Sequence, residues 1–231
     1  REYNNIYYTK GETKVKFTIT EANFDLSLKT ADDETAAPAP VLTVNGVAQN
    51  ITWTQIDGTD KWETEITLTG NDDYVVELSY TDRSTNAMST YTKEVHIDDV
   101  APVFDVTYDN NEARNTNNYK ADRVATIKVT EHNFKAEEVV LNVTAKDITG
   151  ATVDISSKDY AEYAKNAANW TQDGDVWTLV LPKFDIDAIY NITLNYTDLA
   201  ENAATEYATE FVLDKTIANA DNVTIEYSTS I

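Results

Sequence analysis

The chain repeats itself at an interval of about 110 residues, and this duplication constrains its fold more than any other feature. The stretch TITEANF, which ends at Phe24, is matched by KVTEHNF, which ends at Phe134. The stretch YTDRSTN, which begins at Tyr80, is matched by YTDLAEN, which begins at Tyr196. A solenoid repeat is about 20–50 residues long, so this longer interval predicts two tandem domains of similar fold. The offset grows from 110 (134 − 24) to 116 (196 − 80), which indicates a net insertion in the second copy.

Further matches fix the limits of the two copies. Paired positions are Trp53 and Trp170, Trp62 and Trp177, Tyr74 and Tyr190, Tyr91 and Tyr207, and Asp98 and Asp214. We expect a first domain at residues 1–101 that lacks its first strand, and a second domain at residues 102–217 with a helical insertion. Residues 218–231 are a linker or the first strand of a following repeat, because NVTIEYSTS resembles the strand DVTYDNN of the second copy.

Apolar residues alternate with polar ones along both copies, which is the period of a half-buried β-strand. In one such strand the apolar positions are Tyr74, Val76, Leu78 and Tyr80, and in its second copy Tyr190, Ile192, Leu194 and Tyr196. Short strands separated by NG, DG and GND turns favour antiparallel sheets. About seven strands per ~100 residues predict an all-β fold of two tandem immunoglobulin-like β-sandwiches, with a short helix inserted in the second.

Aromatic residues refine this prediction. In each copy a tyrosine, Tyr74 or Tyr190, follows an acidic turn and opens a strand. This is the position of a tyrosine corner, in which the hydroxyl binds the preceding loop. Tryptophans on the strands before it are expected to fill the space between the two sheets.

The turn that follows this strand carries a family resemblance. The stretch YTDLAENAATEYATEFVLDK and the junction DDVAPVF resemble bacterial immunoglobulin-like domains, whose penultimate turn commonly reads Asp-x-Ala-Gly-Asn. The matching positions are Asp198, Ala200 and Asn202 in the second copy and Asp82 and Asn86 in the first, with Glu201 and Thr85 in place of the turn glycine. The resemblance covers nearly the whole chain. It implies a fragment of a cell-surface adhesin, mostly of Firmicutes, some gut members of which look like binders of host immunoglobulin.

Composition excludes several classes of function. A net charge of −22 disfavours nucleic acid and anionic membranes, because both require basic surfaces. The absence of cysteine excludes disulfides, thiolate chemistry and cysteine-bound zinc. No apolar run reaches membrane-spanning length. Neither His96 nor His132 stands in a catalytic motif, so we expect a protein that is not an enzyme. The family resemblance implies a location outside the cell, at a bacterial surface.

Carboxylates near the junction of the two copies suit calcium, although the sequence predicts no obligatory cofactor. Calcium takes several oxygen ligands, and no EF-hand spacing occurs in the chain. The candidate ligands are Glu21, Asp98, Asp99, Asp109 and Glu131. Solvated acidic loops are the alternative explanation of these residues.

The insertion SSKDYAEYAKNAANW of the second copy is the largest difference between the copies. A helix beginning after Ser156 or Ser157 would place Tyr160, Tyr163, Ala164 and Ala167 on one face. This face is either a plug over one end of the sandwich or a contact patch for a partner, since tyrosine is favoured at interfaces.

Two functions compete on these observations. In the first, the domains bind a host protein or glycoprotein, with immunoglobulin as the sharpest hypothesis. In the second, they are a stalk that projects another domain. A stalk needs only stable folds and stiff junctions, whereas a binder needs one copy to carry something extra. Carbohydrate binding is a weaker third alternative, because exposed and buried tryptophans look alike in a sequence.

Overall fold

A computed structural model of the chain describes residues 1–24, 40–82, 84–217 and 223–227. Strands dominate these residues, so the expectation of an all-β fold is confirmed. The chain divides into two compact units. The first comprises Arg1–Ala101 with Leu199–Asn202, and the second comprises Pro102–Asp198 with Ala203–Ile231.

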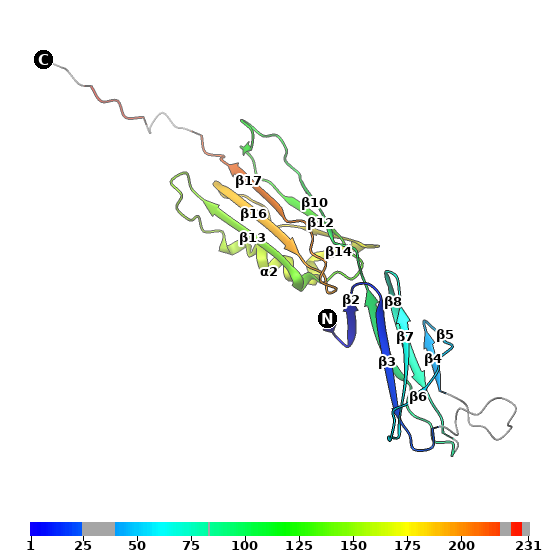
Figure 1. Ribbon diagram of the computed structural model, residues 1–231. Coiled ribbons are helices and arrows are strands. Elements are labelled where there is room, and N and C mark those ends of the chain that lie inside the picture. Colours follow the sequence, from blue (N-terminus) through cyan, green and yellow to red (C-terminus); the bar gives the residue numbers. More distant parts are fainter. Residues whose placement is uncertain (25–39, 83, 218–222, 228–231) are drawn as a thin grey trace. The chain divides into compact units, whose positions relative to one another are not determined.

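The first unit packs two sheets face to face (Figure 1). Their strands are β1 (Glu2–Tyr3), β2 (Ile6–Thr9), β3 (Thr13–Thr20), β4 (Val41–Val44), β5 (Val47–Ala48), β6 (Thr54–Gln55), β7 (Lys61–Leu68), β8 (Asp72–Ser79) and β9 (Tyr91–Ile97). One sheet has the order β1-β2-β9-β8-β4-β5 and the other β3-β7-β6. All pairs are antiparallel except β2 with β9, which is parallel.

The second unit also has two sheets, and its strand β10 has no counterpart among the described strands of the first unit. Its strands are β10 (Val103–Tyr108), β11 (Asn118–Tyr119), β12 (Ala125–Thr130), β13 (Val139–Lys146), β14 (Trp170–Asp173), β15 (Val176–Val180), β16 (Ala188–Tyr196) and β17 (Tyr207–Leu213). The sheets have the orders β10-β12-β15-β14 and β11-β17-β16-β13. The parallel pair of β11 with β17 corresponds to that of β2 with β9.

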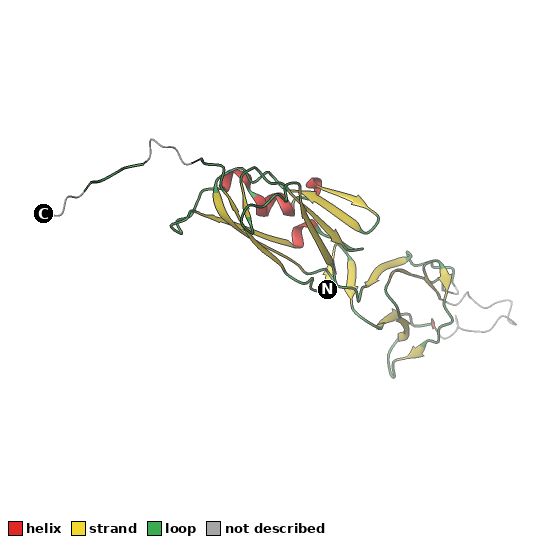
Figure 2. Ribbon diagram, turned by 90° about the horizontal axis from the view of Figure 1, so that it is seen from above, coloured by secondary structure: helices red, strands yellow, loops and turns green. Residues whose placement is uncertain are grey.

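Helices are short and few among the described residues (Figure 2). They are the 3-10 turns η1 (Ala136–Glu138), η2 (Ser156–Lys158) and η3 (Ala167–Asn169) and the α-helix α2 (Tyr160–Lys165). Three of the four therefore lie in the insertion that distinguishes the second copy. Of residues 218–231, the structure describes 223–227, which form no strand and are exposed.

Four aromatic rings form the same cluster in each core. In the first unit, Phe24 lies between 4.8 and 5.3 Å from the ring centroids of Trp53, Trp62 and Tyr80.

In the second unit, Phe134 lies between 4.7 and 5.3 Å from those of Trp170, Trp177 and Tyr196. The duplicated residues of the sequence are thus duplicated packing positions, because burial of large aromatic rings contributes most to a core of this size.

Both predicted tyrosine corners are present. The hydroxyl of Tyr74 donates to the carbonyl of Thr69 at 2.6 Å. That of Tyr190 donates to the carbonyl of Ile186 at 2.9 Å. Each bond joins the start of a strand to the loop before it, and burial raises the pKa of both hydroxyls.

The turn that resembles the bacterial domains keeps a left-handed residue although the glycine is missing. Thr85 has φ +66° and Glu201 has φ +71°. In the first copy, Asp82 accepts hydrogen bonds from the backbone and side-chain nitrogens of Asn86, at 2.8 and 2.7 Å. These bonds hold the turn in a conformation that costs a non-glycine residue roughly 1–2 kcal/mol.

Candidate functional site

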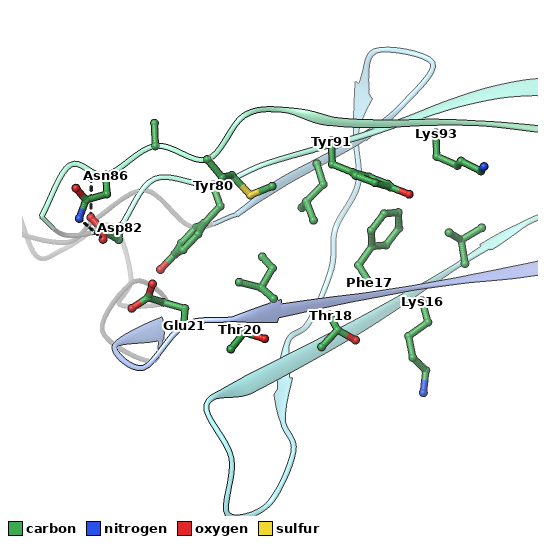
Figure 3. Close-up of a pocket in the computed structure, with 15 residues that line it drawn as sticks. Lys16, Phe17, Thr18, Thr20, Glu21, Tyr80, Asp82, Asn86, Tyr91 and Lys93 are labelled. Carbon is green, nitrogen blue, oxygen red and sulfur yellow. Dashed lines mark hydrogen bonds between the residues drawn. The ribbon is translucent and has the colours of Figure 1, made fainter. Parts of the chain in front are cut away.

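The first unit contains a groove of about 680 Å³ (Figure 3). One wall is β3, and the other consists of the end of β8, the start of β9 and the segment between them. Apolar side chains line it, namely Val15, Phe17, Ile19, Leu78, Tyr80, Ala87, Met88 and Tyr91. Charged side chains stand at its margin, and Figure 3 shows Lys16, Lys93, Glu21 and Asp82 among them.

The groove is open because no described strand of the first unit takes the place that β10 has in the second. In the second unit, β10 pairs with β12 and so covers the corresponding space. In the first unit, β3 corresponds to β12, and among the described residues it is the end strand of its sheet. The groove is the place where a strand equivalent to β10 would lie.

The second unit shows what such a strand contributes. Phe104, Val106 and Tyr108 are the inward residues of β10, and they pack against the core of that unit. The hydroxyl of Tyr108 lies 3.4 Å from that of Tyr207. In the first copy the equivalent of Tyr207 is Tyr91, which is 51% exposed. The groove therefore leaves apolar surface in water that the second unit buries.

The sequence did not single out the residues of this groove as a site. The sequence predicts that the first domain lacks its first strand, but it does not reveal which side chains this exposes. Tyr91 is exposed although Tyr207, with which it is paired in the sequence, is half-buried. Tyr91 is exposed because no described strand takes the place of β10 beside it, and only a comparison of the two copies reveals this.

The five carboxylates proposed as calcium ligands do not all meet. In the first unit, Glu21 follows the end of β3, whereas Asp99 accepts a hydrogen bond at 2.8 Å from the backbone of Gly11, before that strand begins. Eight residues of strand span roughly 26 Å. One ion therefore cannot contact both Glu21 and Asp99.

The same reasoning separates the two candidates of the second unit. Asp109 accepts a hydrogen bond at 2.7 Å from the backbone of Val124, which precedes β12, whereas Glu131 follows the end of β12. Six residues of strand span about 20 Å, so one ion cannot contact both carboxylates.

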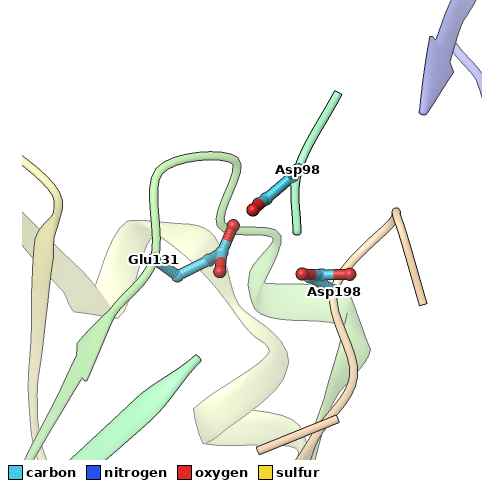
Figure 4. A group of neighbouring side chains, drawn as sticks. All are labelled: Asp98, Glu131 and Asp198. Carbon is cyan, nitrogen blue, oxygen red and sulfur yellow. The ribbon is translucent and has the colours of Figure 1, made fainter. Parts of the chain in front are cut away.

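Glu131 instead lies beside a carboxylate that the sequence did not suggest. An oxygen of Glu131 lies within 4.8 Å of an oxygen of Asp198, and both side chains are buried (Figure 4). Asp98, also drawn in Figure 4, belongs to the first unit and accepts a hydrogen bond from the backbone of Val100 at 2.8 Å. Calcium binding by Glu21, Asp98, Asp99, Asp109 or Glu131 stays a prediction, which melting in excess calcium and in chelator would test.

The inserted helix packs into the second unit. Tyr160 and Ala164 are buried, and the ring of Tyr160 stacks on that of Phe184 with centroids 4.9 Å apart. The carbonyl of Ala164 accepts a hydrogen bond at 2.7 Å from the indole nitrogen of Trp170. This is the placement expected of a plug over the core, and it leaves Tyr163 half-buried and Ala167 exposed. Partner binding by this face stays a prediction.

The two histidines lie in different units and in different surroundings. His96 is buried on β9, with Nδ1 3.1 Å from Asp73. His132 is exposed, with Nδ1 2.9 Å from Asp175. Each is thus in contact with a carboxylate of its own unit.

Within the described residues, no helix is long and apolar enough to cross a membrane.

No protein-family model matches the chain, and no curated protein matches it either. Among solved structures, a similar one is the Bacteroides ovatus mixed-linkage glucan utilization locus protein SGBP-B, in complex with a mixed-linkage heptasaccharide. The identity is 12%, over 93% of this chain and 45% of that one, with a TM-score of 0.19. The chain therefore spans less than half the length of that structure's chain.

Proposed function

We propose that the chain is a protein-binding segment of a bacterial cell-surface adhesin, built from two tandem immunoglobulin-like domains and without enzymatic activity. The sharpest hypothesis for its partner is host immunoglobulin. The resemblance of the turn at Asp198 to Asn202 supports the assignment to this family of domains, as does the tyrosine corner in each unit.

The observation that carries the binding function is the open groove beside β3. A strand at the end of a sheet presents backbone N–H and C=O groups that an extended segment of another protein can pair with. The groove also offers apolar surface, including Met88 and Tyr91, which are 38% and 51% exposed. Backbone pairing provides affinity in this mode of recognition, and pockets for alternate side chains provide specificity.

The charge of the chain limits which partners suit it. With 40 acidic and 18 basic residues, the surface attracts basic partners over long range. At the groove, however, Lys16 and Lys93 introduce positive charge beside the apolar lining. Lys93 is held by Glu2 at 2.6 Å, and Lys16 by Glu63 at 3.4 Å. We therefore expect the bound segment to be apolar on one face and polar or acidic on the other.

Binding of purified immunoglobulin to the immobilised chain, measured by interferometry, tests this function. We expect Tyr91→Glu to abolish binding, because it places an unpaired charge in the groove. Val47→Glu is the matched control, since Val47 is 66% exposed on β5 of the same unit and does not line the groove. Binding that neither substitution changes, or no binding at all, would contradict the proposal.

A spacer function is the second candidate. The two aromatic clusters and the two tyrosine corners are alike, which is what a stalk of repeated stable units requires. A chain that binds no protein through the groove yet resists proteolysis would favour this alternative.

A further inference from the structure

We infer that the first unit holds a second binding site, a pocket beside Tyr74 that receives a tyrosine side chain of a protein partner. The partner's tyrosine takes the position that Tyr160 has in the second unit. This pocket shares no residue with the groove beside β3, so its function is independent of the one proposed for that groove.

In the second unit, the insertion closes one side of the sandwich with a tyrosine. Its helix α2 lies against β13 (Figure 1), and the ring of Tyr160 stacks on that of Phe184. The hydroxyl of Tyr160 donates to the carbonyl of Lys183 at 3.3 Å. Because Tyr160 is buried there, the second unit fills this site with its own side chain.

The first unit leaves the corresponding place open. Its strands β4 and β7 correspond to β13 and β15, but the connection after β4 consists of residues 45–52, where the second unit has residues 144–169. A pocket of about 220 Å³ remains, lined by residues of both sheets and of the adjoining turns. The lining residues are Val44, Asn45, Gln49, Ile66, Thr67, Leu68, Thr69 and Tyr74.

Strand register shows that this pocket is equivalent to the Tyr160 site. Thr13 is opposite Leu68 in the first unit, and Arg123 is opposite Phe184 in the second. Thr13 and Arg123 differ by the repeat offset of 110 (123 − 13), so Leu68 has the position of Phe184. Thr67 then corresponds to the residue whose carbonyl binds the hydroxyl of Tyr160.

The carbonyl of Thr67 points away from the neighbouring strand β3. The backbone of Glu21 donates to the carbonyl of Asp60 at 2.8 Å, so these two residues are a hydrogen-bonded pair. Bonded and non-bonded pairs alternate along an antiparallel ladder, which makes Thr67 and Lys14 a non-bonded pair. Strand β6 pairs only with the other end of β7. A tyrosine hydroxyl in the pocket can therefore donate to this carbonyl.

The size and lining of the pocket suit an aromatic ring. Ile66 and Tyr74 are half-buried, whereas their counterparts Leu181 and Tyr190 are 3% and 1% exposed. The first unit thus leaves apolar surface in water that the insertion covers in the second. A cavity of about 150 Å³ accommodates benzene, so the pocket of about 220 Å³ has room for one tyrosine ring.

An unsatisfied donor on the same side of the first unit points to the form of the partner. The indole nitrogen of Trp170 donates to the carbonyl of Ala164, near the end of α2, at 2.7 Å. Its counterpart Trp53 is 8% exposed, and its indole nitrogen is buried without an acceptor among the described residues. Since buried donors are nearly always paired, we expect the partner's tyrosine to lie on a short helix whose last turn supplies this carbonyl.

Titration of the full chain with p-cresol, the side chain of tyrosine, tests the pocket by methyl NMR. We expect the methyl resonances of Val44, Ile66 and Leu68 to shift, with a dissociation constant in the millimolar range that is usual for so small a ligand. Toluene has the same ring without the hydroxyl, so it should bind about fivefold more weakly.

Two substitutions that fill the pocket from opposite sheets test its location. Val44→Phe and Ile66→Phe should each weaken the binding of p-cresol by about tenfold or more, because the added ring occupies the pocket. Val41→Phe is the matched control, since Val41 is 47% exposed on the same strand and does not line the pocket. Melting of each variant verifies that the first unit is folded.

A peptide with the sequence of residues 156–169 tests the form of the partner. It should displace p-cresol from the pocket, and the same peptide with Tyr160→Ala should not. The inference would be overturned if p-cresol left the three methyl resonances unshifted or if toluene bound equally well. Unchanged affinity in both folded phenylalanine variants, or equal displacement by the two peptides, would overturn it as well.

Discussion

Replacement of Tyr160 by alanine should unfold the second unit far more readily, because this side chain is part of the core. It is 4% exposed and stacks on Phe184 at 4.9 Å. Removing a large buried aromatic ring costs about 3–5 kcal/mol. A loss of about 4 kcal/mol would be a large part of the 5–15 kcal/mol that stabilises a typical domain, and would lower the melting temperature by roughly 15 °C.

Two further substitutions divide this cost into its parts. Tyr160→Phe removes only the hydroxyl, whose hydrogen bond to the carbonyl of Lys183 is long at 3.3 Å, so we expect a loss of about 1 kcal/mol or less. Tyr163→Ala on the half-buried side should cost about 1 kcal/mol. Urea unfolding followed by tryptophan fluorescence measures all three, and only the transition of the second unit should move. A loss below about 1 kcal/mol for Tyr160→Ala would refute the assignment of this residue to the core.

Three other perturbations test the turns and corners. Thr85→Gly should stabilise the first unit by about 0.5–1 kcal/mol, since it relieves a left-handed β-branched residue at some cost in chain entropy, whereas Thr92→Gly within β9 should destabilise it. Tyr190→Phe should cost the second unit about 1 kcal/mol in urea unfolding, through loss of its bond to the preceding loop. Hydrogen bonds from Asn86 lower the pKa of Asp82 below its usual 3.8, so its stabilising effect should be present above that pH and lost as the pH falls further. The melting temperature of Asp82→Asn, measured above and below that pH, should fall less in acid than that of the parent chain.

Much of the fold could be predicted because successive side chains of a strand point to opposite faces of its sheet, so apolar residues alternate in the sequence where one face is buried. Along β16 the apolar positions Tyr190, Ile192, Leu194 and Tyr196 are all buried, as their period of two requires. The tyrosine corner could be predicted as well, since it depends on a local sequence of turn, tyrosine and strand. The paired aromatic residues that pack in both units are Phe24 with Phe134, Trp53 with Trp170, Trp62 with Trp177 and Tyr80 with Tyr196.

The candidate sites could be predicted only in part, because they depend on distances that sequence separation does not reveal. Glu21 follows the end of β3, whereas Asp99 contacts Gly11 before that strand begins, although the sequence suggested both as ligands of one junction site. Glu131 and Asp198 are 67 positions apart (198 − 131) yet share a buried corner of the second unit. Similarly, the helical face at Tyr160 looked the same whether it covered a core or met a partner.

The difference between the two copies explains why one unit carries a groove and the other does not. Matching aromatic residues hold the two cores together. The two units can therefore share a fold although the edges of their sheets differ. In the second unit, β10 covers the apolar face beside β12, and Arg123 lies 3.9 and 3.7 Å over the rings of Tyr108 and Tyr119. The first unit has neither feature among its described residues, and its equivalent edge remains open to a strand from elsewhere. Because the end strand of a sheet presents unpaired backbone groups, an extended segment that fits the register of β3 can pair with this edge and cover the apolar face beside it.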